Sequence, residues 1–203
     1  MVAAIYREWM TVVRAVSAPT VATIAGATSA ALLASALFIR TTRIGKFEEW
    51  AEILDGLRLR GDETLLDLGW AIAVDIWRAD QIDNSRQNTL RNAELEGVAD
   101  RVDVRTAAIT NLPFDTDSVD VIVSSLVVHN IPSPEARAKA ISEATRVLRP
   151  GGRLVLADIW ATRRHVRQLR QLGWTDARRR GLGWRMWWGP GTGTHLITAT
   201  KPA

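Results

Sequence analysis

One histidine stands where an apolar run gives way to a loop, a position from which a side chain can act on a bound molecule. His129 follows the apolar run 119–126. An imidazole can accept a proton near neutral pH, so His129 is our candidate general base, although packing or capping of the loop is the alternative. Ser124 and Asn130 are candidates for polar contacts beside it. Asp158 ends a later apolar stretch and could reach the rim of the same active site, but we expect it to stabilise a turn.

A second chemical feature is the segment 163–185, which holds eight arginines and a single acid, Asp176. Trp184, Trp187 and Trp188 lie at its C-terminal end. Such a basic and aromatic surface could bind anionic lipid headgroups, or the phosphates and bases of RNA. The alternative is a solvated helix face whose side-chain stems pack on the surface.

The composition is that of a folded protein with one core. The chain has 203 residues, of which 47% are hydrophobic and 24% are charged. It contains no cysteine, which excludes disulfides and thiolate metal sites and fits a reducing compartment. The net charge of +4 comes mainly from arginine. It indicates either an anionic partner or simply an arginine-rich composition.

Apolar runs and helical spacing alternate along the chain after residue 46. The spacing predicts helices over 47–57, 84–95, 134–148 and 163–172, and apolar runs predict strands over 64–68, 71–76, 102–106, 119–126, 154–159 and 195–200. Strands that alternate with helices predict an α/β fold with a doubly wound, mostly parallel sheet. In such sheets ligands bind outside the carboxyl ends of the strands.

The N-terminal part carries a long uncharged segment. Residues 15–39 are 25 residues without a charge, and 20–39 lack proline. About 20 apolar residues in a helix can cross a bilayer, so we expect an N-terminal hydrophobic helix that spans or associates with a membrane. Arg40, Arg43 and Lys46 follow it, and this excess of positive charge favours a C-terminal domain on the inner, cytoplasmic face.

Two other interpretations of that segment stay open. A signal peptide with a cleavage site at 34–36 would export the remainder, and a buried helix would need no membrane. We predict an N-terminal region over 1–46, with the helix at about 20–39, and a second domain over 47–203.

Three stretches of the second domain resemble one known family. Thr-Leu-Leu-Asp-Leu-Gly at 64–69, Val-Asp-Val-Ile-Val-Ser-Ser-Leu at 119–126 and Arg-Val-Leu-Arg-Pro-Gly-Gly-Arg-Leu at 146–154 are similar, in order and spacing, to motifs of class I S-adenosylmethionine-dependent methyltransferases. A Leu-Pro-Phe turn at 112–114 resembles the branch that acts on small molecules. The resemblance covers residues 47 to 200 and implies the Rossmann-like fold of that family.

The resemblance also implies a cofactor, S-adenosylmethionine, and a set of positions that hold it. In the family a carboxylate that ends strand two binds the ribose hydroxyls, and Asp75 occupies that position here. His129 stands in the family's substrate-facing loop. The cofactor-binding positions implied are Asp67, Gly69, Asp75, Ile76, Ala108 and Ser124, and no metal is expected.

The sequence departs from the family at two places. Gly69 is followed at once by 70–75, which leaves no room for the glycine-rich turn and the helix that precede strand two in the family. Parallel neighbours need a crossover of about a dozen residues, so we expect one long strand over 65–77 or a hairpin at 69–70. Truncation, degeneration, or a neighbouring segment in place of the helix would each account for this gap. Ala108 stands where the family commonly has an acid that accepts from the adenine, and alanine offers no side-chain acceptor.

These observations favour S-adenosylmethionine-dependent methyl transfer to a small or lipophilic acceptor at the membrane. The alternative is a catalytically impaired relative that binds lipid or a protein partner. An RNA-modifying enzyme is permitted by the arginines but has no motif, so we expect no nucleic-acid partner. A nicotinamide-dependent dehydrogenase is disfavoured because no Gly-x-Gly-x-x-Gly follows a strand.

Overall fold

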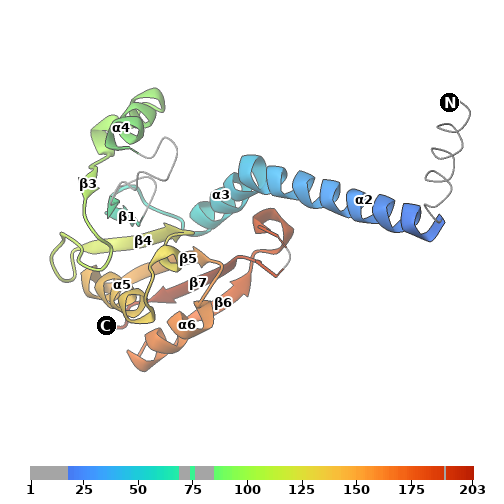
Figure 1. Ribbon diagram of the computed structural model, residues 1–203. Coiled ribbons are helices and arrows are strands. Elements are labelled where there is room, and N and C mark those ends of the chain that lie inside the picture. Colours follow the sequence, from blue (N-terminus) through green and yellow to red (C-terminus); the bar gives the residue numbers. More distant parts are fainter. Residues whose placement is uncertain (1–17, 69–73, 76–84, 190) are drawn as a thin grey trace, which may run out of the picture.

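A five-stranded sheet forms the centre of the protein, with helices on both faces (Figure 1). The computed structural model describes residues 18–68, 74–75, 85–189 and 191–203. The strand order is β1-β4-β5-β7-β6, with bounds Leu65–Asp67 for β1, Val119–Ser125 for β4, Leu148–Asp158 for β5, His195–Thr200 for β7 and Arg178–Gly181 for β6. Strands β1, β4 and β5 are parallel, and β7 is antiparallel to both of its neighbours. The predicted α/β fold is confirmed, as a mixed sheet.

The second predicted strand lies apart from this sheet. β2 (Val74–Asp75) pairs in parallel with β3 (Arg105–Thr106) as a separate two-stranded unit. β1 ends at Asp67, and among the described residues β1 and β2 share no ladder. Both predictions for this region, one long strand and an antiparallel hairpin, are therefore wrong for the part that can be described. The path over 69–73 lies outside the described residues.

Two cores hold the helices on the two faces of the sheet. α5 (Pro134–Val147) and α6 (Thr162–Gln171) cover one face, where Ile141 and Leu169 are buried with side chains of β4, β5 and β7. α3 (Lys46–Gly56) covers the other face through Ile53. α5 begins where the sequence predicts, because Ser133 accepts a hydrogen bond from the Ala136 N–H and a proline follows it. α4 (Arg86–Leu95) and the short turn η2 (Ala99–Arg101) lie beside β3.

The N-terminal helix projects from the body of the molecule (Figure 1). α2 (Ala18–Arg40) continues through the π-helical turn η1 (Thr41–Gly45) into α3. The C-terminal turn η4 (Gly183–Met186) packs against this junction, so closely that a Cβ on Gly45 would lie 2.3 Å from the Arg185 carbonyl oxygen. A glycine is therefore required where the two segments meet.

Most of α2 lies clear of the other described residues. Described side chains from residue 26 to residue 39 are mostly exposed, which contradicts the buried-helix interpretation. None of the helices in the described residues is sufficiently long and apolar to cross a membrane. The predicted transmembrane helix is therefore not supported, and the division of the chain at residue 46 stays a prediction.

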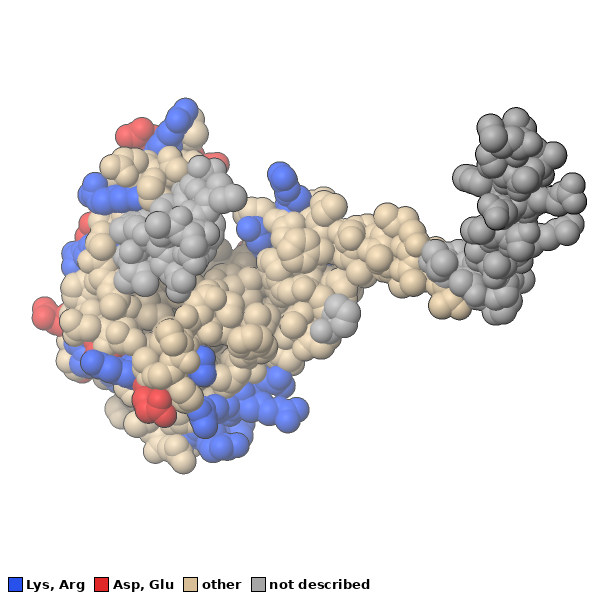
Figure 2. Space-filling model, viewed as in Figure 1, with Lys and Arg blue, Asp and Glu red and all other residues tan. Residues whose placement is uncertain are grey.

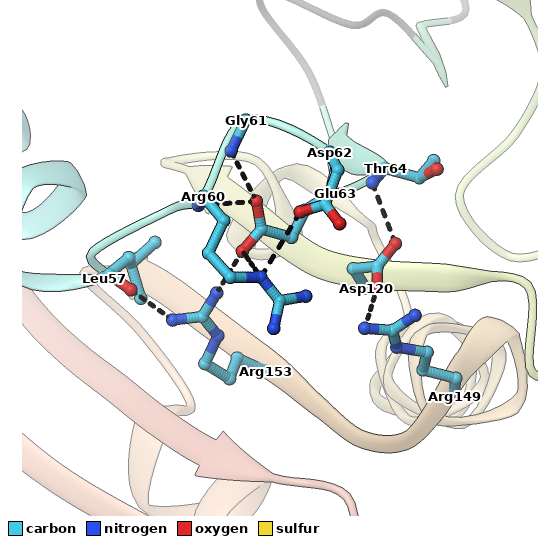
Figure 3. Close-up of polar contacts among 9 residues, drawn as sticks. All are labelled: Leu57, Arg60, Gly61, Asp62, Glu63, Thr64, Asp120, Arg149 and Arg153. Atoms are coloured by element: carbon cyan, nitrogen blue, oxygen red, sulfur yellow. Dashed lines mark hydrogen bonds and ion pairs between the residues drawn. The ribbon is translucent and has the colours of Figure 1, made fainter.

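A network of paired charges closes the end of the sheet where β1 and β4 begin, which we call the amino edge. The amino-edge cluster consists of Arg60, Glu63, Asp120, Arg149 and Arg153 (Figure 3). Glu63 accepts from the backbone N–H groups of Arg60 at 2.8 Å and Gly61 at 2.9 Å, and Arg153 lies 3.8 Å from it. Asp120 accepts from the Thr64 N–H at 2.8 Å and pairs with Arg149.

Candidate functional site

The loops that follow β4 and β5 lie together at the opposite end, the carboxyl edge of the sheet. Leu126 after β4 has φ 59° and Ala161 after β5 has φ 57°, the left-handed region that a side chain disfavours. The Leu126 N–H donates to the Ala157 carbonyl at 2.8 Å, which ties the first loop to β5. Strained residues in two adjacent loops are a reason to look for a site between them, because such strain clusters at functional sites.

His129 and Asp158 form a dyad between these loops. His129 lies in η3 (Val128–Asn130), and its Nδ1 is 2.8 Å from Oδ1 of Asp158 at the end of β5. Asp158 is fully buried and also accepts from the backbone N–H groups of His129 at 3.1 Å and Ile159 at 2.7 Å. A buried carboxylate with three donors is fixed in position, so it fixes the imidazole ring as well.

The dyad leaves the second ring nitrogen of His129 for an incoming group. The Asp158 carboxylate can only accept, so the neutral imidazole carries its proton on Nδ1. The other nitrogen, Nε2, then has a lone pair that can accept a proton. The side chain of His129 is 16% exposed, and its ring meets Trp160 edge-on with centroids 6.1 Å apart. Trp50 of α3 reaches the same edge, where its Nε1 donates to the Ser125 hydroxyl at 2.9 Å. The arrangement can accept a proton from a molecule held between the loops.

The predicted site residues fall into three groups. Asp67 ends β1 as a half-buried carboxylate, and its register partner Val123 places it next to Ser124 at the carboxyl edge. The Ser124 side chain is buried, and its hydroxyl donates to the Leu68 carbonyl at 3.2 Å. Ala108 lies after β3, and its carbonyl accepts from the Asn111 N–H at 2.8 Å.

Three predicted cofactor positions cannot be placed. Gly69 and Ile76 lie outside the described residues, and for Asp75 only the backbone in β2 is described. Among the described residues no three His, Asp or Glu side chains are grouped in a way that could hold a metal ion.

Asp158 does more than serve the turn that we expected of it. It does accept from the next backbone N–H, but it also binds the ring of the predicted base. Sequence reasoning missed this pair because 29 residues separate the two side chains. The available signal was that both follow neighbouring parallel strands, whose carboxyl ends meet at one edge.

The arginine-rich segment is only partly a helix face. Arg178, Arg179 and Arg180 form most of β6, the edge strand of the sheet, and Arg180 pairs with Glu49 of α3 at 3.2 Å. Arg185 lies 2.5 Å from Glu52. The segment thus attaches the N-terminal helices to the sheet, a role that neither the lipid nor the RNA interpretation included.

Comparison with known proteins places residues 64–156 in a family described as methyltransferase domain. An arsenite methyltransferase of Halobacterium salinarum is 31% identical over 117 residues, which cover 49% of this chain and 28% of that protein. The ubiquinone/menaquinone biosynthesis C-methyltransferase UbiE of Roseobacter denitrificans is 29% identical over 133 residues, or 57% of this chain and 50% of that protein. The chain thus spans half or less of the length of these relatives.

Solved structures show the same fold at low identity. The [4+2]-cyclase SpnF matches 72% of this chain and 77% of its own, with a TM-score of 0.55 at 18% identity. A geranyl diphosphate C-methyltransferase of Streptomyces coelicolor, solved with S-adenosyl-L-homocysteine, matches 69% of this chain and 74% of its own, with a TM-score of 0.50 at 16% identity. The family's cofactor is S-adenosylmethionine. Residues 64–156, which supply β1, β4, His129 and most of β5, match the methyltransferase-domain model, and this match, the relatives and the shared fold support a class I S-adenosylmethionine-dependent methyltransferase.

Proposed function

We propose that the protein transfers a methyl group from S-adenosylmethionine to a small-molecule acceptor, with His129 as the general base. The observation that carries this proposal is the His129–Asp158 dyad at the carboxyl edge, 2.8 Å between Nδ1 and Oδ1. Open α/β sheets bind ligands at this edge, and the dyad gives it a group that can take a proton.

The fit to the cofactor rests on the end of β1. Asp67 is a half-buried carboxylate there, which suits the polar groups of S-adenosylmethionine. Ser124 contributes by holding the Leu68 carbonyl, and therefore the chain just after β1, in place. Ala108 could offer only its backbone, whose carbonyl is already an acceptor for Asn111. When bound, the cofactor supplies an electrophilic methyl group on sulfur.

The residues of this chain would act mainly by position. Methyl transfer is an in-line displacement, so its rate depends on how the acceptor is held. Nε2 of His129 would take the acceptor's proton as the new bond forms, and Asp158 would stabilise the resulting imidazolium without taking the proton itself. Trp160, which meets the imidazole edge-on and is 59% exposed, would pack against an apolar acceptor.

The direct test is product formation. The full chain is incubated with methyl-labelled S-adenosylmethionine and a panel of phenol, quinol and amine acceptors, and labelled product is measured beside S-adenosylhomocysteine. We expect turnover that His129→Ala abolishes and that Glu135→Gln, an exposed change on α5, leaves intact. Turnover that survives His129→Ala would contradict the assigned base. Cofactor binding without turnover on any acceptor would favour the impaired relative that binds lipid or a protein partner.

A location at the inner face of the cell membrane is the less direct part of the proposal. It is supported by large apolar side chains on α2 that are exposed, namely Leu32, Leu33, Phe38 and Ile39 at 66%, 63%, 46% and 59%. Arg43 is exposed beside them, and α2 contains no acid. An apolar helix with basic neighbours can lie on anionic lipid without crossing it.

Vesicle cosedimentation tests that location. We expect the chain to pellet with phosphatidylserine vesicles, and the double change Leu32→Ser, Leu33→Ser to release it. A wild-type chain that stays in the supernatant would contradict the membrane location and would leave the dyad chemistry untouched.

A further inference from the structure

Two arginines and a histidine lie on β7, β6 and the start of α6, on the side of β5 away from β4. In the register of the sheet Asp158 faces His195 at the start of β7, and His195 faces Gly181 at the end of β6. Arg179 pairs with Ile197, which packs in the core below α6, so Arg179 and His195 share the α6 face of the sheet. The Arg179 Nε donates to the hydroxyl of Thr162, the first residue of α6, at 2.9 Å.

Arg163 follows Thr162 and completes what we call the carboxyl-edge cluster: Arg163, Arg179 and His195. Figure 2 shows Lys and Arg side chains gathered over β6 and the adjoining part of α6. Because facing residues on neighbouring strands have Cβ atoms about 5 Å apart, His195 places the cluster directly beside Asp158.

Among the described residues no acid forms an ion pair with Arg163 or Arg179. Asp158 is bound by His129 and by the Ile159 N–H. Asp176 is bound to the Thr200 N–H through both oxygens, at 3.1 and 3.0 Å. Glu49 pairs with Arg180 at 3.2 Å. The described ion pairs include neither Arg163 nor Arg179, and the Nδ1 of His195 is buried without a hydrogen-bond partner.

The electrostatics of the cluster agree with this lack of acids. Burial, followed by the nearby Arg163 charge, lowers the pKa of Arg179. Burial lowers the pKa of His195 as well, and Arg179 and Arg163 add to the effect. Like charges held together without a counter-ion are unfavourable, so a bound anion would relieve them.

We propose that the carboxyl-edge cluster binds an anionic group of the acceptor, a carboxylate or a phosphate. This inference rests on the proposed function, since it names the class of molecule that the dyad would act on. A planar guanidinium offers paired donors that match both groups, and two arginines at the same edge of the sheet as the dyad would orient the acceptor as well as attract it. A solvated basic face would need neither a half-buried Arg179 nor its hydrogen bond to the Thr162 hydroxyl.

The test uses inorganic pyrophosphate and malonate as probes for the two anions. Each is titrated into the full chain at constant ionic strength, and the binding constant is measured by calorimetry. We expect Arg163→Gln and Arg179→Gln each to weaken binding by at least about tenfold, the loss expected for one charge-assisted hydrogen bond. Arg101→Gln is the matched control, because Arg101 is exposed on η2 and pairs only with Asp100 among the described residues. Arg163 is exposed, so Arg163→Gln keeps the test valid if Arg179→Gln fails to fold.

Each outcome has one meaning. Tighter binding of pyrophosphate than of malonate identifies a phosphate, and the reverse identifies a carboxylate. The inference is overturned if neither probe binds, if Arg101→Gln weakens binding equally, or if only an RNA oligonucleotide binds through these arginines. S-adenosylhomocysteine is titrated into the same samples. Its failure to bind while the probes still bind would refute the methyltransferase proposal and leave the anion site standing.

Discussion

Arginines gather at both edges of the same sheet, and only one of the two groups has acids to pair with. At the amino edge, Arg149 and Arg153 meet Asp120 and Glu63, whose side chains are 11% and 7% exposed. At the carboxyl edge, Arg163 and Arg179 have no described acidic partner, and the one nearby buried carboxylate is bound to His129. The difference indicates that the amino edge contributes to folding and that the carboxyl edge is built for a ligand.

The physical reason lies in what each carboxylate already binds. Glu63 and Asp120 each accept backbone N–H groups that precede β1, so their arginines neutralise acids that hold the chain in place. The Arg60 N–H, followed by other backbone groups, holds the pKa of Glu63 below its usual range against the effect of burial. At the carboxyl edge Asp158 orients a histidine, and the described ion pairs include neither Arg163 nor Arg179, so these arginines remain available.

The largest expected effect is a loss of activity when the carboxyl edge is changed. His129→Ala removes the proton acceptor and should lower kcat by roughly 10²–10⁴-fold, the range for a general base. Thermal stability should fall only modestly, because the buried Asp158 loses one donor but keeps the backbone N–H groups of residues 129 and 159. Steady-state kinetics with the best acceptor of the panel, together with a melting curve, measure both quantities. A large loss of stability with unchanged kcat would reverse the roles assigned to the edges.

The next effect is one of stability at the amino edge. Asp120→Ala removes the acceptor of the Thr64 N–H and the partner of Arg149, so it should reduce the free energy of unfolding by about 1–3 kcal/mol. The kcat of the folded fraction should be unaffected. Urea unfolding with Glu135→Gln as control measures this. An unchanged midpoint would show that the paired network does not stabilise the start of β1.

A smaller effect appears as a dependence of stability on pH beside the dyad. His165 in α6 is buried, neither of its ring nitrogens has a described partner, and burial lowers its pKa from 6.5 despite the opposing charge of Asp158. The unfolded chain therefore binds the proton more readily. The stability that the neutral His165 contributes to the folded state is complete above about pH 6.5. It is lost as the pH falls below that value, because the unfolded chain then takes up the proton first. Unfolding by urea at pH 7.5 and pH 5.5 should show this loss.

The variant His165→Leu gives the control for that titration. It removes the group, so its stability should fall less between the two pH values. Equal slopes for the variant and the wild type would assign the pH dependence to other groups.

The smallest effect returns to the carboxyl-edge cluster. Arg163 is exposed and has no described partner, so Arg163→Gln should change the free energy of unfolding by no more than about 0.5 kcal/mol. Relief of repulsion with Arg179 would make that change stabilising. Equilibrium unfolding at low salt measures it. A loss as large as that of Asp120→Ala would mean that both clusters are structural.

Many of the helices and strands could be predicted from the sequence, because the residue patterns that indicate them are local. The apolar run 119–126 predicts β4, and Ser133 before a proline with Pro150-Gly151 after it predicts α5. The strand over His195–Thr200 was predicted with these bounds. β6 was missed because arginines carry no strand signal, and it forms because β7 offers an edge to pair with.

The site was predictable only in part. His129 could be found from its place after a strand, whereas its pairing with Asp158 depends on the register of β4 with β5, which no local pattern contains. The ion pair that attaches α3 to β6 is equally non-local, since its partners Glu49 and Arg180 are 131 residues apart. The separation of β2 from β1 also depends on a pairing partner, β3, that lies about 30 residues further along the chain.

The central claim is that the carboxyl edge holds S-adenosylmethionine next to the dyad. Its most direct test is calorimetric titration of the full chain with S-adenosylhomocysteine. The account predicts one site per chain, weakened by Asp67→Ala at the end of β1 and unchanged by Arg149→Gln at the amino edge. The absence of measurable heat up to millimolar ligand would contradict it.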